Sequence, residues 1–273
     1  MNLYLAEGGS IFEKCWKINE QERRKSDCEF TAQGAFQKEK SGARGDLFES
    51  TNILQSFYYC NEFTEKVIIP KSKNFMLDSG AFTFFSAGGK VDWNEYIKQY
   101  ADFIKRNSVN LYFELDIDKL IGYDKVLYYR KKLEDMTGKP CIPVWHKSRG
   151  QDEFIKMCEQ YDYVSIGGIV SKEISQKEYK YFPYLIKTAH ENGAKIHGLG
   201  FTNLQGLTKY HFDSVDSTAW VSGNRFGSVY KFNGKTMIKY DKQQGQRLAD
   251  YKAVAIHNFR EWVKFQHYAE KYL

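Results

Sequence analysis

The sequence predicts an α/β fold, a regular or irregular (β/α)8 barrel of the TIM type, with a β-hairpin insertion and a long C-terminal helix. Short apolar runs typical of buried strands alternate with helical periodicity along most of the chain. Seven such runs are visible, and an eighth is expected within 51–69 or after Thr218, a count that favours a barrel over a doubly wound sheet. No Gly-x-Gly-x-x-Gly follows the first run, which argues against a dinucleotide fold. We therefore expect one barrel domain over residues 1–273.

The first part of the chain is the least regular. Residues 2–6 are predicted to form a strand, because they are mostly apolar and two glycines follow at 8–9. Residues 10–50 mix acids and bases and predict a helix followed by a long polar loop, a kind of segment that is usually functional or mobile. The apolar positions within 53–58 have helical spacing, with a short strand as the alternative.

From residue 75 onward, strands and helices alternate regularly. The helix at 92–107 is the clearest, since its apolar residues recur every three or four positions. The predicted strands are 75–77, 111–115, 141–145, 163–166, 195–199 and 212–215. The predicted helices are 92–107, 123–136, 151–160, 176–192 and 203–209.

Residues 226–240 interrupt this alternation. Asn233-Gly234 lies between two short runs of β-forming residues, which is the signal of a hairpin with a type I′ turn. The last segment, 243–271, is predicted to be a long helix whose one apolar face docks on the barrel wall.

The composition is that of a globular protein with a substantial core, at 42% apolar and 16% aromatic residues. A net charge of +6 mildly favours an anionic partner such as nucleic acid. The chain has no run of about 18 apolar residues and no signal-peptide pattern at its start, so neither a membrane span nor a membrane partner is expected. The five cysteines are scattered without Cys-x-x-Cys spacing, which favours free thiols in a cytoplasmic protein.

Polar residues and glycines gather where the predicted strands end, which is where the active sites of parallel barrels lie. The strongest candidates are three carboxylates, Asp78, Asp116 and Asp213. Three acids that converge on one mouth repel each other unless a substrate, a metal or a proton intervenes. The other residues at strand ends are candidates for substrate binding: Ser79, Trp145, His146, Gly167, Gly168 and His197.

Most candidates also have a purely structural interpretation. Asp78 alone could cap a helix or start a turn. His146 and His197 could be hydrogen-bonded histidines of the barrel end, and the neighbouring glycines could simply allow close packing. Asp118 and Asp216 are expected to be solvated or capping residues.

Several of these segments, in the same order, resemble motifs of the tRNA-guanine (queuine) transglycosylase superfamily. The segment at 77–82, which includes Asp78-Ser79-Gly80, is similar to the family's Asp-Ser-Gly-Gly-Phe motif, and the segment at 212–215 is similar to its Phe-Asp-Cys-Val motif. The short chain is also similar to phage-borne relatives that exchange bases in DNA. The remaining similar segments are Leu115-Asp116, Ser165-Ile166-Gly167-Gly168-Ile169, Gly198-Leu199-Gly200, Asn224-Arg225-Phe226-Gly227 and the Asn233-Gly234 hairpin.

The resemblance implies a base-exchange glycosyltransferase that replaces guanine in nucleic acid with a 7-deazaguanine base and needs no cofactor or metal. It implies that Asp213 is the nucleophile of a covalent glycosyl intermediate and that Asp78 is the general base. Asp116 would accept hydrogen bonds from the base, while Ser79 and the backbone at 167–168 would hold its carbonyl edge. Basic residues near the hairpin would contact phosphate beside the mouth, namely Arg225, Lys231, Lys235, Lys239 and Lys242.

The chain departs from the family in two respects. Residues 241–273 contain no cysteine, so the family's zinc element is missing, and DNA is slightly favoured over tRNA as the polymer. Trp145-His146 stands where the family has a glutamine, so base selectivity can differ. Two alternatives stay open, a metal-dependent barrel hydrolase and a barrel that binds nucleic acid or a nucleoside without catalysis. The metal ligands of the first alternative would be Asp78, His146, His197 and Asp213.

Overall fold

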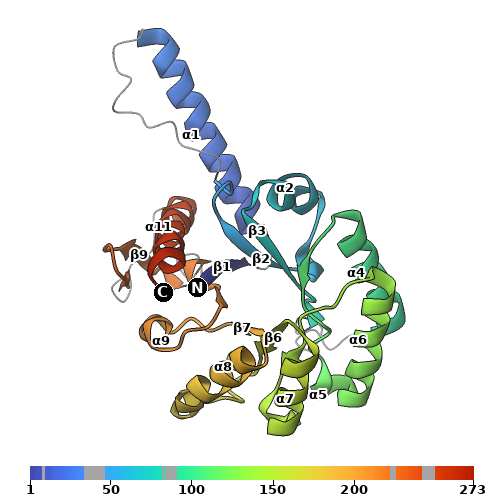
Figure 1. The fold of residues 1–273 in the computed structure, drawn as a ribbon. Coiled ribbons are helices and arrows are strands. Elements are labelled where there is room, and N and C mark those ends of the chain that lie inside the picture. Colours follow the sequence, from blue (N-terminus) through green and yellow to red (C-terminus); the bar gives the residue numbers. More distant parts are fainter. Residues whose placement is uncertain (8–9, 34–46, 82, 84–90, 222–225, 242–249) are drawn as a thin grey trace.

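The computed structural model contains an eight-stranded parallel sheet that curls into a TIM-type barrel (Figure 1), as predicted. The structure describes residues 1–7, 10–33, 47–81, 83, 91–221, 226–241 and 250–273. The barrel strands are β1 Asn2–Glu7, β2 Asn52–Ser56, β3 Asn74–Asp78, β4 Leu111–Tyr112, β5 Val144–Trp145, β6 Tyr163–Ile166, β7 Lys195–Gly198 and β8 Ser214–Ser217.

The strands form a ring because the two outer strands of the sheet are also joined. The order in the sheet is β4-β3-β2-β1-β8-β7-β6-β5. A parallel bridge between Phe113 and Ile142 links the β4 side to the β5 side. There the amide of Ile142 donates to the Tyr112 carbonyl (2.8 Å), and the amide of Glu114 donates to the Ile142 carbonyl (3.1 Å). The carboxyl ends of all eight strands therefore open on one mouth.

Helices surround the strands on the outside of the ring (Figure 1). Helix α4 shows why these segments are helical: its apolar residues share one buried face, and Asp92 caps it by accepting hydrogen bonds from the amides of Asn94 and Glu95. The α-helices are α1 Ile11–Gln33, α2 Ile69–Lys71, α4 Trp93–Arg106, α5 Asp118–Ile121, α6 Tyr123–Thr137, α7 Gln151–Gln160, α8 Phe182–Glu191, α9 Leu204–Lys209 and α11 Tyr251–Tyr272. Short 3-10 or π turns are η2 Phe57–Tyr59, η3 Thr64–Ile68, η4 Lys147–Arg149, η5 Gln176–Tyr181 and η6 Ala219–Val221.

A small apolar cluster, separate from the two larger clusters of the wall, fills the barrel interior. Its buried members are Tyr4, Ala6, Leu54, Met76, Phe113, Ile142 and Val144. Successive strand residues point to opposite faces, so the next inward position lies two residues further along each strand. From Leu54, Met76 and Val144 this step leads to the polar residues Ser56, Asp78 and His146. The apolar cluster therefore lies inside the barrel, directly below the polar residues of the mouth.

Several strand boundaries differ from the predicted ones; β4, for example, ends at Tyr112 and β5 begins at Val144. The apolar residues at 53–58 form strand β2 followed by the short turn η2, so the alternative interpretation is confirmed and the eighth strand lies within 51–69. Strand β8 begins at Ser214 instead of residue 212. Asp213 therefore precedes this strand, whereas Asp216 lies within it near its carboxyl end.

The predicted hairpin and C-terminal helix are both present. Strands β9 Val229–Phe232 and β10 Met237–Tyr240 pair in antiparallel register, and the backbone of β9 is bound to α11 because the Tyr230 amide donates to Asn258 Oδ1 (2.8 Å). The predicted type I′ turn is wrong, because Phe232 pairs with Met237 and four residues form the connection. The Asn233 side chain accepts hydrogen bonds from two amides of this connection, which stabilises the longer turn.

Helix α1 projects away from the barrel in Figure 1, whereas α11 lies beside β9. Most of the long loop predicted after α1 falls within 34–46, outside the described residues. Within the described parts of the chain, no helix combines the length and apolarity that crossing a membrane requires. Cys15, Cys60, Cys141 and Cys158 are free thiols, as predicted.

Candidate active site

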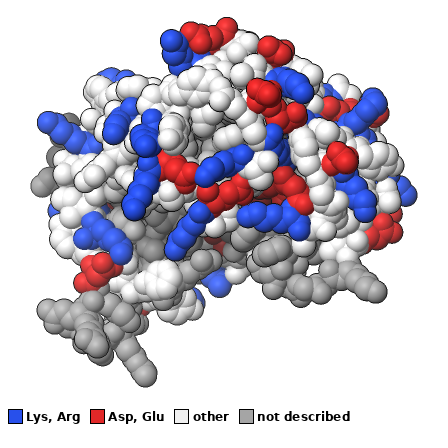
Figure 2. All heavy atoms as spheres, turned by 90° about the horizontal axis from the view of Figure 1, so that it is seen from below, with Lys and Arg blue, Asp and Glu red and all other residues white. Residues whose placement is uncertain are grey.

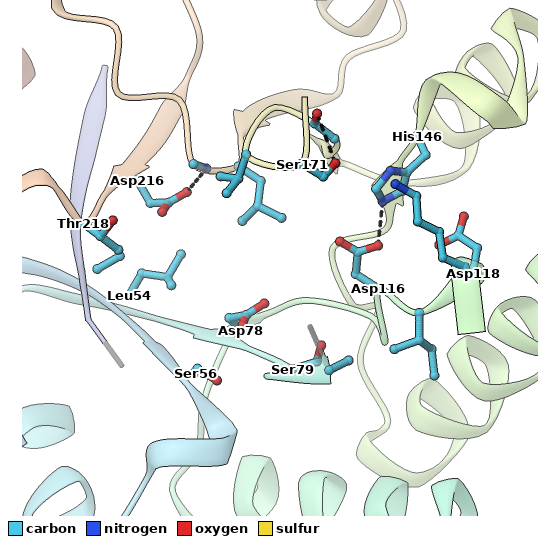
Figure 3. Close-up of a pocket in the computed structure, with 18 of the residues that line it drawn as sticks. Leu54, Ser56, Asp78, Ser79, Asp116, Asp118, His146, Ser171, Asp216 and Thr218 are labelled. Carbon is cyan, nitrogen blue, oxygen red and sulfur yellow. Dashed lines mark hydrogen bonds and ion pairs between the residues drawn. The ribbon is translucent and has the colours of Figure 1, made fainter. Parts of the chain in front are cut away.

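A cavity of about 530 Å³ opens at the carboxyl ends of the strands (Figure 3). Its lining combines apolar side chains with ionisable ones, and among the latter the described residues contribute five carboxylates, one lysine, Lys119, and the imidazole of His146. The five carboxylates are Glu7, Asp78, Asp116, Asp118 and Asp216. Acidic groups therefore outnumber basic ones in the cavity.

Asp78 lies at the end of β3, and its Oδ2 accepts a hydrogen bond from the Gly80 amide (3.0 Å). Gly80 has a φ of +72°, and a Cβ atom there would lie 2.5 Å from Ser56 Oγ, so the turn requires glycine. Burial is the main cause that raises the pKa of Asp78 to about 7; the Gly80 hydrogen bond opposes it, and Asp116 and Asp216 add to it. Near neutral pH this group exchanges a proton readily.

Asp116 and His146 follow the neighbouring strands β4 and β5 and meet on one side of the mouth. His146 Nε2 lies 2.6 Å from Asp116 Oδ1, and His146 Nδ1 lies 3.2 Å from Glu173 Oε2. Burial alone would lower the pKa of His146, but the hydrogen bond and charge of Asp116 raise it to about 9. A Cβ atom at Gly167 would lie 2.9 Å from the His146 ring, so this glycine makes room for the imidazole.

A buried ionic network supports the same side of the mouth. Glu114 is fully buried; its Oε2 accepts from Arg130 Nε (2.5 Å) and its Oε1 from Arg149 Nη1 (3.1 Å). Arg149 Nε also donates to Asp118 Oδ2 (2.7 Å). Burial would raise the pKa of Asp118, but Arg149 lowers it overall. The guanidinium of Arg149 also stacks 4.2 Å from the centre of the Tyr123 ring. This network thus holds Asp118 in place.

Asp216 is held on the opposite side, near the end of β8. Its Oδ1 accepts from the Gly200 amide (2.5 Å) and lies 3.3 Å from His197 Nε2. His197 is fully buried inside the barrel, where its Nδ1 lies 2.5 Å from Ser214 Oγ, which also contacts the hydroxyl of Tyr163 (2.5 Å). His197 therefore positions Asp216 and does not itself line the cavity, so its predicted placement as a substrate-binding residue is wrong.

Asp213 does not reach the mouth. It precedes β8 at the amino end of the barrel, where its carbonyl accepts from the amide of Asn2 (2.8 Å). Its Oδ2 accepts from the Ile196 amide (2.8 Å) and lies 2.9 Å from His190 Nε2. The predicted convergence of Asp213 with the other two carboxylates is therefore wrong. Asp216, which was expected to be solvated or capping, takes that place because it lies within β8 near the carboxyl end, whereas Asp213 precedes the strand.

The remaining predicted residues divide between the cavity and its support. Ser79 and Gly168 line the cavity, as does Asp118, which was expected to be solvated or capping. Trp145 does not line it: its ring packs against Phe154 and its Nε1 donates to a backbone carbonyl (2.8 Å). Arg225 lies outside the described residues. The four metal ligands of the hydrolase alternative do not come together, since His197 lies inside the barrel and Asp213 lies at its amino end.

The sequence interpretation overlooked several residues around the mouth. Glu7 lines the cavity, and Glu173 orients His146. Glu114 lies within the predicted strand at 111–115, where a charged residue inside an apolar run was an available signal of a buried ion pair. Alternation along β8 was a second signal, since it places Ser214 and Asp216 on one face and Asp213 on the other.

Comparisons with known proteins point to the fold. No known family and no curated protein matches the chain. A putative fructose-1,6-biphosphate aldolase from Coccidioides immitis is similar in structure, with a TM-score of 0.51, 8% identity, and coverage of 98% of this chain and 88% of that chain. A structure described as "QR15, an Aldolase" has 14% identity and a TM-score of 0.40 over 61% of this chain and 76% of that chain. The fold is a TIM-type barrel.

These findings overturn the transglycosylase resemblance, together with the base-exchange and pentosyltransferase functions that it implied. No transglycosylase family model matches the chain, and the structure that resembles it over 98% of its length is described as a putative aldolase. The motif that carried the nucleophile also fails in the structure, because its Asp213 lies at the wrong end of the barrel. Short segments in a shared order can arise from the barrel itself, since every parallel barrel repeats strands that end in glycines and polar residues.

The predictions of a nucleic-acid partner and of one domain are not tested by these findings and stay predictions. On the face drawn in Figure 2, Asp and Glu side chains gather near the middle, and Lys and Arg side chains lie around them. Charges of both signs are thus interspersed on this face.

Proposed function

We propose that the cavity is the active site of an enzyme that makes or breaks a carbon–carbon bond by aldol chemistry on a small, uncharged hydroxy-carbonyl compound. The observation that carries this proposal is Asp78, a carboxyl group with a pKa of about 7 that faces a cavity at the barrel mouth. Both protonation states of such a group are populated near neutral pH, as general acid–base catalysis requires. The similarity of the barrel to a putative aldolase supports the reaction class.

In the cleavage direction, the ionised Asp78 takes the proton of the substrate's β-hydroxyl group. The bond between the hydroxyl-bearing carbon and its neighbour breaks, and the hydroxyl-bearing carbon becomes a carbonyl. The electron pair passes to the other fragment, which leaves as an enolate. Asp78 then returns the proton to the enolate carbon, so atoms and electrons balance without an oxidant or a reductant.

The charge of the lining supports an uncharged substrate. Five carboxylates line the cavity, against the amine of Lys119 and the imidazole of His146, whose pKa is raised to about 9, so the acidic groups are still in excess. A sugar phosphate carries about two negative charges per phosphate near neutral pH, so these acids would repel it. The bisphosphate after which the neighbouring aldolase is named is therefore not the substrate that we propose here.

The lining also bears on how the substrate carbonyl is activated. Lys119, the one lysine among the described lining residues, has a side chain that is 59% exposed and lies 3.4 Å from Glu173 Oε2. An amine that forms a Schiff base must be neutral, a state that burial favours and that ion pairing with an acid opposes. This supports an activating group other than a lysine amine.

Exchange of carbon-bound hydrogen tests the proposal without knowledge of the natural substrate. In deuterated water, the wild-type protein should catalyse hydrogen–deuterium exchange next to the carbonyl of dihydroxyacetone or hydroxyacetone, followed by NMR. The rate should rise with pH and level off above the pKa of Asp78, about 7, because the ionised form is the base. Asp78→Asn should lower the rate by about 100-fold or more.

Asp213→Asn is the matched control, since it is the same substitution at the amino end of the barrel, and it should leave the exchange rate within about twofold. If no neutral carbonyl compound exchanges above the protein-free blank, the aldol assignment is wrong. If Asp78→Asn exchanges as fast as wild type, Asp78 is not the base.

Asp216→Asn tests the corrected composition of the site. Asp216 lines the cavity, so loss of its charge should raise KM or lower kcat in the exchange assay by about tenfold. Asp213→Asn should change neither. The opposite result, in which Asp213→Asn loses exchange activity and Asp216→Asn does not, would mean that Asp213, and not Asp216, belongs to the site.

A further inference from the structure

We propose that Asp116, Asp118 and His146 bind a divalent transition-metal ion at the barrel mouth. One ligand atom from each of these residues lies within 4.8 Å of the others. Asp116 and Asp118 lie two residues apart on the segment that follows β4, and Asp118 is the first residue of α5. His146 directly follows β5. The closure of the barrel between β4 and β5 brings the imidazole to the two carboxylates.

The ligand types suit a first-row ion such as Zn²⁺ or Mn²⁺. Two carboxylates and one imidazole form a mixed oxygen and nitrogen set, which these ions accept at bond lengths of about 2.0–2.2 Å. Ligand atoms around such an ion lie roughly 3 Å apart. His146 Nε2 and Asp116 Oδ1, at 2.6 Å, are already near that separation. The ion would replace the proton of this hydrogen bond, and the three ligand atoms, which lie within 4.8 Å of one another, would close around it.

Each flank of the cluster is held by an outer residue that is not itself a ligand. The other ring nitrogen of His146, Nδ1, faces Glu173 Oε2 at 3.2 Å. Metal-binding histidines usually donate their second N–H to such a carboxylate, which fixes the ring orientation. Arg149 Nε holds Asp118 through its Oδ2 at 2.7 Å.

A second observation indicates that a ligand belongs at this position. Ser79 is 1% exposed and lines the same cavity, but its hydroxyl oxygen has no hydrogen-bond partner among the described residues. Figure 3 shows it beside Asp78, on the side of the cavity where Asp116 lies. An unsatisfied buried hydroxyl is costly, so it indicates a bound group. This oxygen has almost no accessible surface, so the Ser79 side chain would turn toward the cavity before a substrate or water held by the ion supplies that partner.

The ion would complete the proposed function, on which this part of the inference rests. A bound divalent ion polarises a carbonyl oxygen and accepts the charge of the enolate, while Asp78 moves the proton. The ion would also offset the repulsion among the carboxylates that line the cavity. This is the activating group that Lys119 is not placed to provide.

Isothermal titration of the full chain with Zn²⁺ and with Mn²⁺, after dialysis against a chelator, tests the site. We expect one ion per chain, with a dissociation constant in the micromolar range or below for Zn²⁺. Asp118→Asn and His146→Ala should weaken binding by at least about tenfold, and Glu173→Gln by about tenfold because it removes only the outer support. His190→Ala is the matched control, since it breaks the His190–Asp213 pair at the other end of the barrel and should leave the affinity unchanged.

The absence of saturable binding overturns the proposal, as does unchanged affinity in His146→Ala. If His146→Ala does not fold, Glu173→Gln replaces it in the test, because this variant retains all three metal ligands. Unchanged affinity in a folded Glu173→Gln protein also counts against the site. Binding and activity can fail separately. An ion that binds as described without any exchange activity supports this site and overturns the aldol assignment. Full exchange activity after chelation overturns the role of the ion.

Discussion

Asp78→Asn is expected to stabilise the protein at alkaline pH while it removes the proposed activity. The pKa of Asp78 is raised from 3.8 to about 7 in the folded state, so the folded protein binds this proton more tightly than the unfolded chain. Stability therefore falls as pH rises through the interval between these two values and levels off above the higher one. A pKa change of this size corresponds to roughly 4 kcal/mol at most. The asparagine stays neutral, so it avoids this penalty and can still accept the Gly80 hydrogen bond.

Urea unfolding from about pH 5 to pH 9 measures this effect. The gain of Asp78→Asn over wild type should grow up to about pH 7, reach a few kcal/mol, and stay constant above it. Asp213→Asn provides the comparison, because Asp213 accepts a backbone hydrogen bond at the amino end and should show no such gain. A variant that is less stable than wild type at about pH 8.5 would show that Asp78 is stabilised as a carboxylate, contrary to the structure.

Glu114→Gln is expected to destabilise the protein by about 3–5 kcal/mol, because it leaves buried charge uncompensated. Glu114 is fully buried, and the side chains of Arg130 and Arg149 are only 5% and 2% exposed. The glutamine keeps the shape and can still accept from the Val144 amide, which donates to Glu114 Oε1 at 2.8 Å. The loss of stability therefore measures the effect of removing the negative charge of Glu114 alone. Because Arg149 also holds Asp118, this variant should weaken metal binding as well.

Equilibrium urea unfolding checks this expectation, with Asp135→Asn as the control. Asp135 pairs with Lys131 on the surface at 3.2 Å, with side chains that are 63% and 79% exposed. Exposed pairs of this kind are worth only about 0.5 kcal/mol, so the control should change little. A loss below about 1 kcal/mol in Glu114→Gln would mean that water or a rearranged partner neutralises the two arginines.

Local sequence patterns predicted a helix or strand correctly where its structure depends on its own residues alone. The face of α4 repeats every three or four residues, and its start carries a capping aspartate, so its predicted range differs from the observed one by a single residue at each end. Segment 52–56 was harder, because a short apolar run fits a helix or a strand equally well until neighbouring strands pair with it.

The site was predictable in part for the same reason. Asp78 and Asp116 follow strands whose ends are recognisable, and parallel topology brings such ends to one mouth. The third carboxylate was misplaced because β8 is set by its pairing with β1 and β7, which its own residues do not reveal. Asp213 precedes the strand that forms, whereas Asp216 lies within it near its carboxyl end.

The sequence by itself determined the alternation of strands and helices, the barrel class and the gathering of polar groups at strand ends, since these depend on periodicity within short segments. Only the tertiary structure decided which acids share the cavity and which cations neutralise the others. Glu114 meets Arg130 from 16 residues away and Arg149 from 35 residues away, and Asp116 meets His146 from 30. Such pairs depend on how strands close into a ring and how α6 packs on them, and no local pattern carries that information.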